Sequence, residues 1–332
     1  MYRDFYGLRE LPFELTPNPK YLYLTPRHRE ALSNLEYGLS SAKTVTVLIG
    51  EAGTGKTTLL RAALESEMCR DVRCVYLGNP ALTRHEFVEV LARRFELGSA
   101  AGRSKGTLLE KLEHVLRERR SHGEITALVI DEAQSLSDAL LEEVRLLANM
   151  ESASEKLLPM VLAGQPEFGI RLEQPAVRAL KQRVALRCEI VPFELEETSA
   201  YIAARIATAG GEPAKLFTRQ AVFLVHEASC GVPRAINVLC DNALVSGFAL
   251  QRQPVDRAIV TEVCKDFRLR GLERRTPLGA IAGNGNGNGN AAASHLVDLQ
   301  SEPTPETDAP PEIPTGIGRP RRRFTLLGLG RP

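Results

Sequence analysis

One eight-residue stretch constrains the fold more than any other part of this chain: Gly50-Glu-Ala-Gly-Thr-Gly-Lys-Thr57. It matches the spacing G-x-x-x-x-G-K-[ST], in which the backbone N–H groups of a glycine-rich turn converge on phosphate oxygens. The apolar residues 45–49 before it read as a buried strand, and residues 57–64 after it read as a helix. Because a helix N-terminus attracts anions, this strand–turn–helix order predicts a phosphate-binding loop in an α/β fold.

The loop assigns a role to each of its polar residues. Lys56 is expected to reach the β- and γ-phosphates of a nucleotide, and the Thr57 hydroxyl is expected to bind Mg²⁺. The alternative is a chance match in a glycine turn, which the flanking strand and helix argue against. The residues expected to bind ATP are Gly50, Glu51, Ala52, Gly53, Thr54, Gly55, Lys56, Thr57 and Thr58.

A second motif follows about seventy residues later. The apolar run Leu128-Val-Ile leads directly into the acidic pair Asp131-Glu132. A buried parallel strand delivers such residues to the edge of the sheet where ligands bind. We expect Asp131 to contribute to the Mg²⁺ site and Glu132 to activate the attacking water as a base. The alternative is an ordinary strand end with two solvated acids.

Composition fits a globular protein and adds few constraints. Hydrophobic residues make up 43% and charged residues 25% of the 332 residues, and the formal net charge is +1. No run of about 18 apolar residues occurs, so we expect no direct membrane insertion. The six cysteines have no metal-ligand spacing, and we expect a reduced, cytoplasmic protein.

Residues 44–193 alternate between strand and helix patterns, which predicts a mainly parallel sheet covered on both faces. The expected strands are Thr44–Ile49, Val72–Leu77, Ile125–Asp131, Leu158–Ala163 and Glu189–Phe193. Helices are expected over Arg27–Leu39 with Thr25 as N-cap, from the Thr83 capping box to Phe95, over Thr107–Arg120, from Ser137 to Ala148, and over Gln174–Ala185.

The chain divides into four parts by these patterns. Residues 1–43 form an N-terminal segment, 44–193 the nucleotide-binding core and 194–270 a small helical domain, with helices at Glu196–Thr208, Thr218–Ala228, Arg234–Leu250 and Asp256–Arg268. The remaining residues, 271–332, contain a Gly/Asn-rich linker and a proline-rich tail, and we expect disorder there. The Arg321–Arg323 cluster with Phe324 is expected to be either a solvated tail or a docking peptide.

The motifs together resemble a known family. Phosphate loop, acidic pair and helical domain are arranged as in the AAA+ ATPases. Several shorter motifs resemble the ExeA/GspA-type ATPases of bacterial secretion systems, whose relatives include exosortase- and transposition-associated ATPases. These motifs are Phe5-Tyr-Gly-Leu8, Pro12-Phe13, Thr16-Pro-Asn-Pro19, Tyr23-Leu24, His28-Arg-Glu-Ala-Leu32, Leu35-Glu-Tyr-Gly-Leu39, Ile130-Asp-Glu-Ala-Gln134, Leu162-Ala-Gly-Gln-Pro-Glu167 and Gln182-Arg183. The resemblance covers residues 1–270 and implies a five-stranded sheet of order 5-1-4-3-2 with a helical lid.

The resemblance also implies further site residues. Gln165, after the fourth strand, matches the sensor 1 position, where an amide hydrogen-bonds the γ-phosphate or the water; a simple turn role is the alternative. Arg234, in Gly231-Val-Pro-Arg234, matches the sensor 2 position. Arg183 matches the arginine finger supplied to a neighbouring copy, with Arg178 and Arg187 as alternatives. A further alternative is that Arg183 is an ordinary surface arginine. The N-terminal segment would cover adenine, through Tyr23, Leu24 or Thr25.

Three functions are compatible with these motifs. The first is an ATPase that acts as a motor or a nucleotide switch and drives a bacterial envelope secretion or export assembly. It would be a homo-oligomer with an inner-membrane protein as partner, and it would lie peripheral to that membrane. The second is a DNA-binding ATPase that assists transposition, for which the basic residues at 93–94, 117–120 and 321–323 are the candidate contacts. DNA is the less favoured partner, because the two helical clusters also carry glutamates. The third is an assembly scaffold that binds ATP without turnover. Secretion-linked members of the family continue into a transmembrane helix and a peptidoglycan-binding domain, whereas this chain continues into its linker and tail.

Overall fold

The computed structural model describes residues 2–16, 18–41, 43–78, 80–152 and 155–267. Five parallel strands form one sheet: β1 (Val45–Gly50), β2 (Val72–Leu77), β3 (Ile125–Ile130), β4 (Met160–Gly164) and β5 (Val184–Ile190). Their order is β2-β3-β4-β1-β5, which confirms the expected order 5-1-4-3-2. The linker and the tail, with the Arg321–Arg323 cluster, lie outside the described residues.

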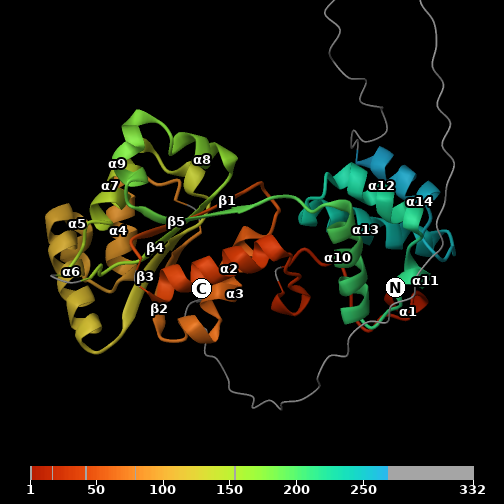
Figure 1. The fold of residues 1–332 in the computed structure, drawn as a ribbon, viewed down its shortest axis with the longest axis horizontal. Coiled ribbons are helices and arrows are strands. Elements are labelled where there is room, and N and C mark those ends of the chain that lie inside the picture. Colours follow the sequence, from red (N-terminus) through yellow and green to blue (C-terminus); the bar gives the residue numbers. More distant parts are fainter. Residues whose placement is uncertain (1, 17, 42, 79, 153–154, 268–332) are drawn as a thin grey trace, which may run out of the picture. The chain divides into compact units, whose positions relative to one another are not determined.

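Helices cover both faces of the sheet (Figure 1). Strand residues alternate between the two sides, as β3 illustrates: Leu128 and Ile130 join one apolar cluster, while Ala127 and Val129 join the other. The first cluster packs against α4 (Arg84–Arg94), α5 (Ser99–Arg103), α6 (Lys105–Ser121), α7 (Asp138–Leu147), α8 (Pro166–Arg171) and α9 (Arg178–Lys181). The second packs against α2 (Pro26–Ser40) and α3 (Lys56–Leu64).

Local capping explains where several of these helices begin. The Thr25 hydroxyl accepts a hydrogen bond from the backbone N–H of His28, with Pro26 in the first turn of α2. Thr83 and Glu86 form the expected capping box of α4, and Ser137 caps α7 as predicted. Short 3₁₀ turns connect other elements at Pro19–Tyr21, Glu67–Cys69, Ala133–Ser135 and Pro175–Val177.

The region before and within the fifth strand differs from the prediction. The expected helix over 174–185 is wrong, because only a 3₁₀ turn and α9 form there, and the chain is already in β5 at Val184. The expected strand over 189–193 starts too late and runs too far. Pairing with β1 fixes the strand instead, from Val45 opposite Val184 to Gly50 opposite Ile190. Pro192 lacks the N–H that a further ladder bond needs.

A helical domain follows the sheet. It comprises α10 (Leu195–Thr208), α11 (Pro213–Leu216), α12 (Arg219–Ser229), α13 (Pro233–Ala249) and α14 (Arg257–Asp266). The short N-terminal helix α1 (Tyr2–Phe5) packs beside α13 (Figure 1). Aromatic and apolar residues of the N-terminal segment complete the core of this domain: Tyr2, Tyr6, Leu8 and Phe13.

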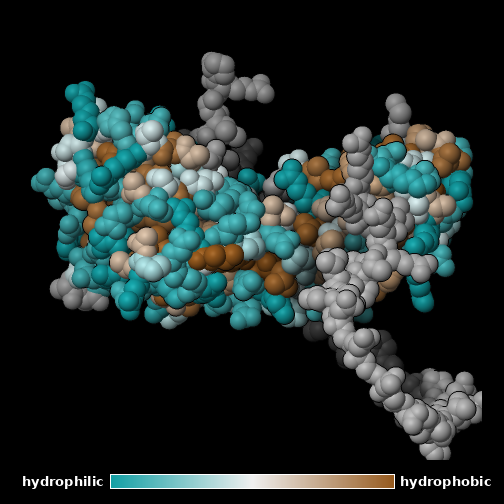
Figure 2. Space-filling view, turned by 90° about the horizontal axis from the view of Figure 1, so that it is seen from above, coloured by the Kyte–Doolittle hydropathy of each residue, from teal (hydrophilic) through white to brown (hydrophobic). Residues whose placement is uncertain are grey.

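Hydrophilic residues cover most of the sheet-containing part on the face seen in Figure 2, with hydrophobic residues scattered among them. Among the described residues, no helix combines the length and apolar composition needed to cross a membrane.

Candidate nucleotide-binding site

The phosphate loop connects the end of β1 to the start of α3. Gly53 and Gly55 have φ angles of +84° and +100°, a region that glycine enters without steric cost. The Thr54 hydroxyl donates to the carbonyl oxygen of Glu51 at 2.8 Å and closes the turn. The loop therefore leads into the N-terminus of α3 with the backbone geometry that an anion site requires.

Lys56 lies folded onto this loop. Its Nζ donates hydrogen bonds to the carbonyl oxygens of Gly50 at 2.8 Å and Glu51 at 2.9 Å. Burial lowers the pKa of Lys56, while the nearby carboxylates of Glu132 and Asp131 oppose that shift. An ammonium group held by neutral carbonyls can exchange them for phosphate oxygens, which bind it more strongly as charge-assisted acceptors.

Asp131 accepts hydrogen bonds from two hydroxyl groups. The Thr57 hydroxyl donates to Oδ2 at 2.7 Å, and the Tyr76 hydroxyl donates to the same atom at 2.8 Å. The backbone N–H of Glu132 donates to Oδ1 at 3.0 Å. Burial raises the pKa of Tyr76, and its hydrogen bond to Asp131 raises it further. The carboxylate is thus oriented from three sides at the end of β3.

Two glutamine side chains restrain Glu132. Gln134 Nε2 donates to Glu132 Oε2, and Gln165 Nε2 donates to the same oxygen at 3.4 Å. Gln134 Oε1 in turn accepts the backbone N–H of Gln165 at 3.1 Å. Glu132 has a φ of +56°, a left-handed conformation that costs a non-glycine residue free energy and often marks functional positions.

The helical domain reaches the loop through the start of α13. The backbone N–H of Arg234 donates to the carbonyl oxygen of Gly53 at 3.2 Å. Gly231 and Phe193 join the two domains nearby, since the N–H of Phe193 donates to the carbonyl of Gly231 at 2.8 Å. The Arg234 side chain is exposed and forms no hydrogen bond or ion pair within the described ranges.

A cleft of about 380 Å³ opens between these groups. Of the predicted site residues, the cleft is lined by Ala52, Gly53, Thr54, Gly55, Lys56, Thr57, Thr58, Glu132 and Arg234. Gly50, Glu51, Asp131 and Gln165 lie behind this surface, in contact with it through the hydrogen bonds above. Arg183 does not line the cleft.

Aromatic rings from the N-terminal segment and the helical domain also line the cleft, together with Phe193. Phe193 lies with its ring centroid 5.9 Å from Tyr23, 5.2 Å from Tyr201 and 5.6 Å from His28. Of the three residues expected to cover adenine, Tyr23 lines the cleft, whereas Leu24 and Thr25 do not. Thr25 caps α2 instead, and Leu24 packs against the apolar cluster on that side of the sheet.

Arg183 lies at the start of β5, at the end of the parallel strands opposite to the phosphate loop. It precedes Val184, which is the partner of Val45 at the start of β1, and the phosphate loop begins at the other end of that strand. Five residue steps along a strand separate the two ends by roughly 16 Å. Arg187 pairs with Glu173 at 3.2 Å, while no ion pair of Arg178 occurs within the described residues. None of these three arginines lines the cleft of its own chain.

The basic cluster on α6 is largely engaged within the protein. Arg117 pairs with Glu113 at 2.7 Å, Arg120 pairs with Glu155, and Arg119 donates to the Thr126 hydroxyl at 3.4 Å. These contacts use guanidinium groups that a nucleic-acid phosphate would otherwise bind.

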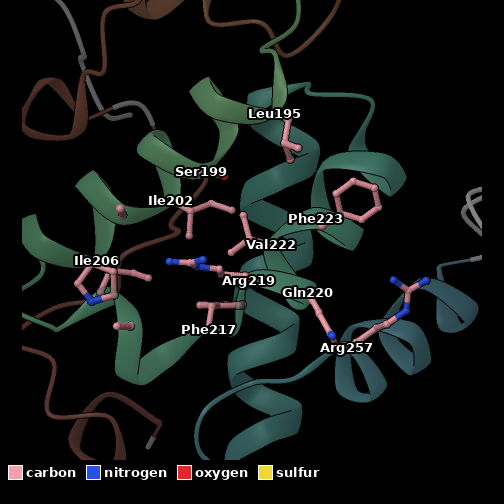
Figure 3. A pocket seen from close by; sticks show the side chains of 13 residues that line it. Leu195, Ser199, Ile202, Ile206, Phe217, Arg219, Gln220, Val222, Phe223 and Arg257 are labelled. Atoms are coloured by element: carbon pink, nitrogen blue, oxygen red, sulfur yellow. The ribbon is translucent and has the colours of Figure 1, made fainter. Parts of the chain in front are cut away.

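A second groove, of about 590 Å³, lies on the helical domain between α10, α11 and α12 (Figure 3). Its floor is apolar, with Ile202, Ile206 and Phe217, and Arg219 and Arg257 are the charged residues that line it. It is larger than the cleft at the phosphate loop. The residues that line it include no carboxylate and no glycine-rich turn, and the predicted phosphate loop lines the smaller cleft.

Four polar residues around the cleft had no role in the site predicted from the sequence. Tyr76 contacts Asp131, and Gln134 contacts Glu132 from two residues along the chain. His28 directs Nδ1 to the Thr25 hydroxyl at 2.8 Å and Nε2 to the carbonyl of Thr54 at 3.4 Å. Asn237 lines the cleft three residues after Arg234, a spacing that places both on one helix face and could have indicated it.

The comparisons with known proteins agree with this geometry. A family described as AAA domain matches residues 39–172. General secretion pathway protein A of Aeromonas hydrophila is 39% identical over 250 residues, which are 75% of this chain and 45% of that protein. The chain therefore spans less than half the length of this relative.

Solved structures with a similar fold include two proteins of origin recognition complexes. The ORC2 protein of Aeropyrum pernix, in ADPNP and ADP complexes, matches with a TM-score of 0.55 and 16% identity, over 77% of this chain and 71% of that one. Drosophila ORC bound to DNA matches with a TM-score of 0.59 and 19% identity, over 77% and 64%. The chain thus contains an AAA domain, and its sequence is similar to that of the ExeA/GspA-type AAA+ proteins.

Proposed function

We propose that this protein binds ATP with Mg²⁺ in the cleft and hydrolyses it. The observation that carries the proposal is the convergence of Lys56, Thr57, Asp131 and Glu132 at one edge of the sheet, with Thr57 and Asp131 in direct contact at 2.7 Å. Arg234 approaches the same loop from the helical domain. A site that only binds a nucleotide has no need of a carboxylate restrained as Glu132 is.

The oxygen atoms at Thr57 and Asp131 fit a magnesium ion. Two adjacent ligands in an octahedral shell at about 2.1 Å from the ion lie about 3 Å apart, close to the separation of these two oxygens. Magnesium in such sites uses one or two carboxylates together with substrate phosphates, and when bound it neutralises charge on the phosphates. Thr57 and Asp131 would hold it.

Glu132 is the proposed base. Its carboxylate takes a proton from the attacking water while the water oxygen bonds to the γ-phosphorus and the bond to the β–γ bridging oxygen breaks. Lys56 and the loop N–H groups bind the phosphates, and Arg234 stabilises charge on the γ-phosphate. Gln134 and Gln165 hold the carboxylate in place, which extends the sensor role expected of Gln165.

The hydrolysis cycle is proposed to drive or switch a bacterial envelope secretion or export assembly. Support comes from the relative named general secretion pathway protein A. We further propose a homo-oligomer in which Arg183 acts on the cleft of a neighbouring copy, since it lies far from its own. A cytoplasmic location, peripheral to the inner membrane through a partner protein, follows from this role.

ATP turnover by the full chain tests the proposal. Lys56→Ala should abolish binding or turnover, and Glu132→Gln should retain ATP binding while slowing hydrolysis by about 10²-fold or more. Turnover at the wild-type rate in Glu132→Gln would refute the assignment of the base.

The same assay separates the alternative functions. Turnover that duplex DNA stimulates at low salt, with the stimulation fading at moderate salt, would favour an ATPase that assists transposition. ATP binding without turnover, even with Mg²⁺ and high protein concentration, would favour an assembly scaffold.

A further inference from the structure

Asn237 is a buried polar residue of the cleft to which the mechanism above gives no role. It lies in the second turn of α13, is 7% exposed, and lines the cleft together with Tyr201 and Arg205. Its amide oxygen accepts a hydrogen bond from the Tyr201 hydroxyl at 2.9 Å. Its amide nitrogen has no hydrogen-bond partner among the described residues and is not fully enclosed.

A buried arginine fixes the direction of this hydrogen bond. Arg205 is 7% exposed and has no carboxylate partner in the described part of the chain; its Nε and Nη2 donate to the carbonyl oxygens of Pro12 and Glu14. Its Nη1 donates to the Tyr201 hydroxyl at 2.8 Å. Since a guanidinium can only donate, the Tyr201 oxygen is the acceptor and its own hydrogen must be used elsewhere.

That hydrogen points to Asn237 and sets the orientation of its amide. With Oδ1 facing Tyr201, the hydroxyl has an acceptor. The flipped amide would present Nδ2 instead, and the hydroxyl hydrogen would lose its acceptor in a buried position, which costs free energy. The chain from Arg205 through Tyr201 therefore turns Nδ2, a donor of two hydrogens, toward the open cleft.

The position along α13 indicates which part of a nucleotide this donor meets. Arg234, whose N–H contacts the phosphate loop, lies three residues earlier, and three residues advance a helix by about 4.5 Å. Tyr201, which donates to Asn237, packs against the rings of Tyr23 and Phe193, and all four residues line the cleft. A nucleotide with its phosphates on the loop places its nucleoside there.

We propose that Asn237 is a nucleotide-binding residue whose Nδ2 donates to an acceptor on the nucleoside of ATP, with Tyr201 and Arg205 as the residues that position it. The acceptor is a ring nitrogen of the base or a ribose hydroxyl oxygen. Because Arg205 also holds two carbonyls of the N-terminal segment, the same contacts tie that segment to nucleotide recognition. This inference rests on the proposed ATP site.

The experiment measures ATP affinity of the full chain by calorimetry for Asn237→Ala, Asn237→Asp, Tyr201→Phe and the double variant Asn237→Ala/Tyr201→Phe. Asn242→Asp is the matched control, because this amide lies on the same helix and donates to the carbonyl of Val238 at 2.8 Å, outside the cleft. Loss of one donor should weaken binding about fivefold to tenfold in Asn237→Ala. Asn237→Asp should lose more, since it presents an acceptor to an acceptor.

Tyr201→Phe tests whether the tyrosine acts through the amide. It should weaken ATP binding on its own, yet add no further loss in the Asn237→Ala background. Additive losses of affinity in the double variant would show that Tyr201 contributes to ATP binding independently of Asn237. They would overturn the proposal that Tyr201 positions the amide. Unchanged affinity in Asn237→Ala, within a factor of two of wild type, would overturn the binding role itself.

ATP analogues identify the acceptor. Each analogue lacks one acceptor: N1, N3 or N7 of the base, or the 2′- or 3′-hydroxyl. The analogue that binds wild type more weakly than ATP does, but binds Asn237→Ala as well as ATP does, lacks the atom that the amide contacts. If Asn237→Ala weakens every analogue as much as ATP, the amide does not contact the nucleoside and the inference fails. Absence of ATP binding by wild type would instead refute the proposed function.

Discussion

A single methyl group at Gly53 tests the contact between the phosphate loop and the helical domain. A Cβ added there would lie 2.8 Å from the Cβ of Arg234 and 3.2 Å from Cγ1 of Val232, and φ at this position is +84°. Gly53→Ala must therefore strain the loop and displace the start of α13. We predict that it lowers the free energy of unfolding and also weakens ATP binding, because Arg234 moves with the helix.

The magnitude has two parts that a matched variant separates. Alanine in the left-handed region costs about 1–2 kcal/mol. Forcing a close-packed contact apart costs about 1–3 kcal/mol more, for a total of about 2–5 kcal/mol. Gly55 has a φ of +100°, yet a Cβ there would meet nothing within 4 Å. Gly55→Ala should therefore cost only the backbone part, about 1–2 kcal/mol.

Urea denaturation without nucleotide, followed by circular dichroism, measures both variants. A second comparison uses Arg234→Gly, which removes the Cβ that Gly53→Ala would meet. If the steric contact is the cause, the double variant loses less stability than the two single changes added together. Equal losses for the alanine variants at 53 and 55, or strict additivity with Arg234→Gly, would refute the reasoning.

Three further predictions concern other parts of the molecule. Burial lowers the pKa of His28 below its ordinary value of 6.5, so the unfolded chain takes up the proton at a higher pH than the folded chain does. The contribution of neutral His28 to the free energy of unfolding should be fully present above about pH 6.5 and should fall as the pH drops. His28→Gln should lessen this fall in urea midpoints measured from about pH 8 to about pH 5, whereas identical pH profiles for the two proteins would contradict the prediction. Arg205→Met should lower the free energy of unfolding by about 2–4 kcal/mol, since it leaves buried carbonyls without a donor, and an unchanged urea midpoint would count against that role. Arg183→Ala and Glu132→Gln, each strongly slowed in ATP turnover alone, should recover turnover when mixed, because a mixed interface unites an intact base with an intact arginine. Recovery with Arg178→Ala instead would assign the arginine finger to that residue.

The sequence predicted the parts of the site that lie on short contiguous motifs. The phosphate loop and the Asp131–Glu132 pair each combine a strand with its following residues, and the capping signals at Thr25, Thr83 and Ser137 are also local. Local backbone chemistry decides these features, so a single sequence contains enough information for them.

The prediction of the fifth strand was wrong for the opposite reason. Residues 184–190 lie at the edge of the sheet, where Ala185, Arg187 and Glu189 are exposed, and no apolar run marks them. Pairing with β1 decides that they form a strand, which is a tertiary effect that outweighs local propensity. The hydrogen bonds from Arg205 through Tyr201 to Asn237 were missed for a related reason. They join two helices and the N-terminal segment across long separations in the sequence.

The packing of the N-terminal segment against α13 has a consequence for biosynthesis. The Tyr6 hydroxyl donates to the carbonyl of Leu244, a partner 238 positions later in the chain. At about 5–20 residues per second, a ribosome adds that partner roughly 10–50 s after Tyr6. During this interval the aromatic residues of the segment are exposed and available to chaperones, and the helical domain gains its full core only when the last of its helices leaves the ribosome.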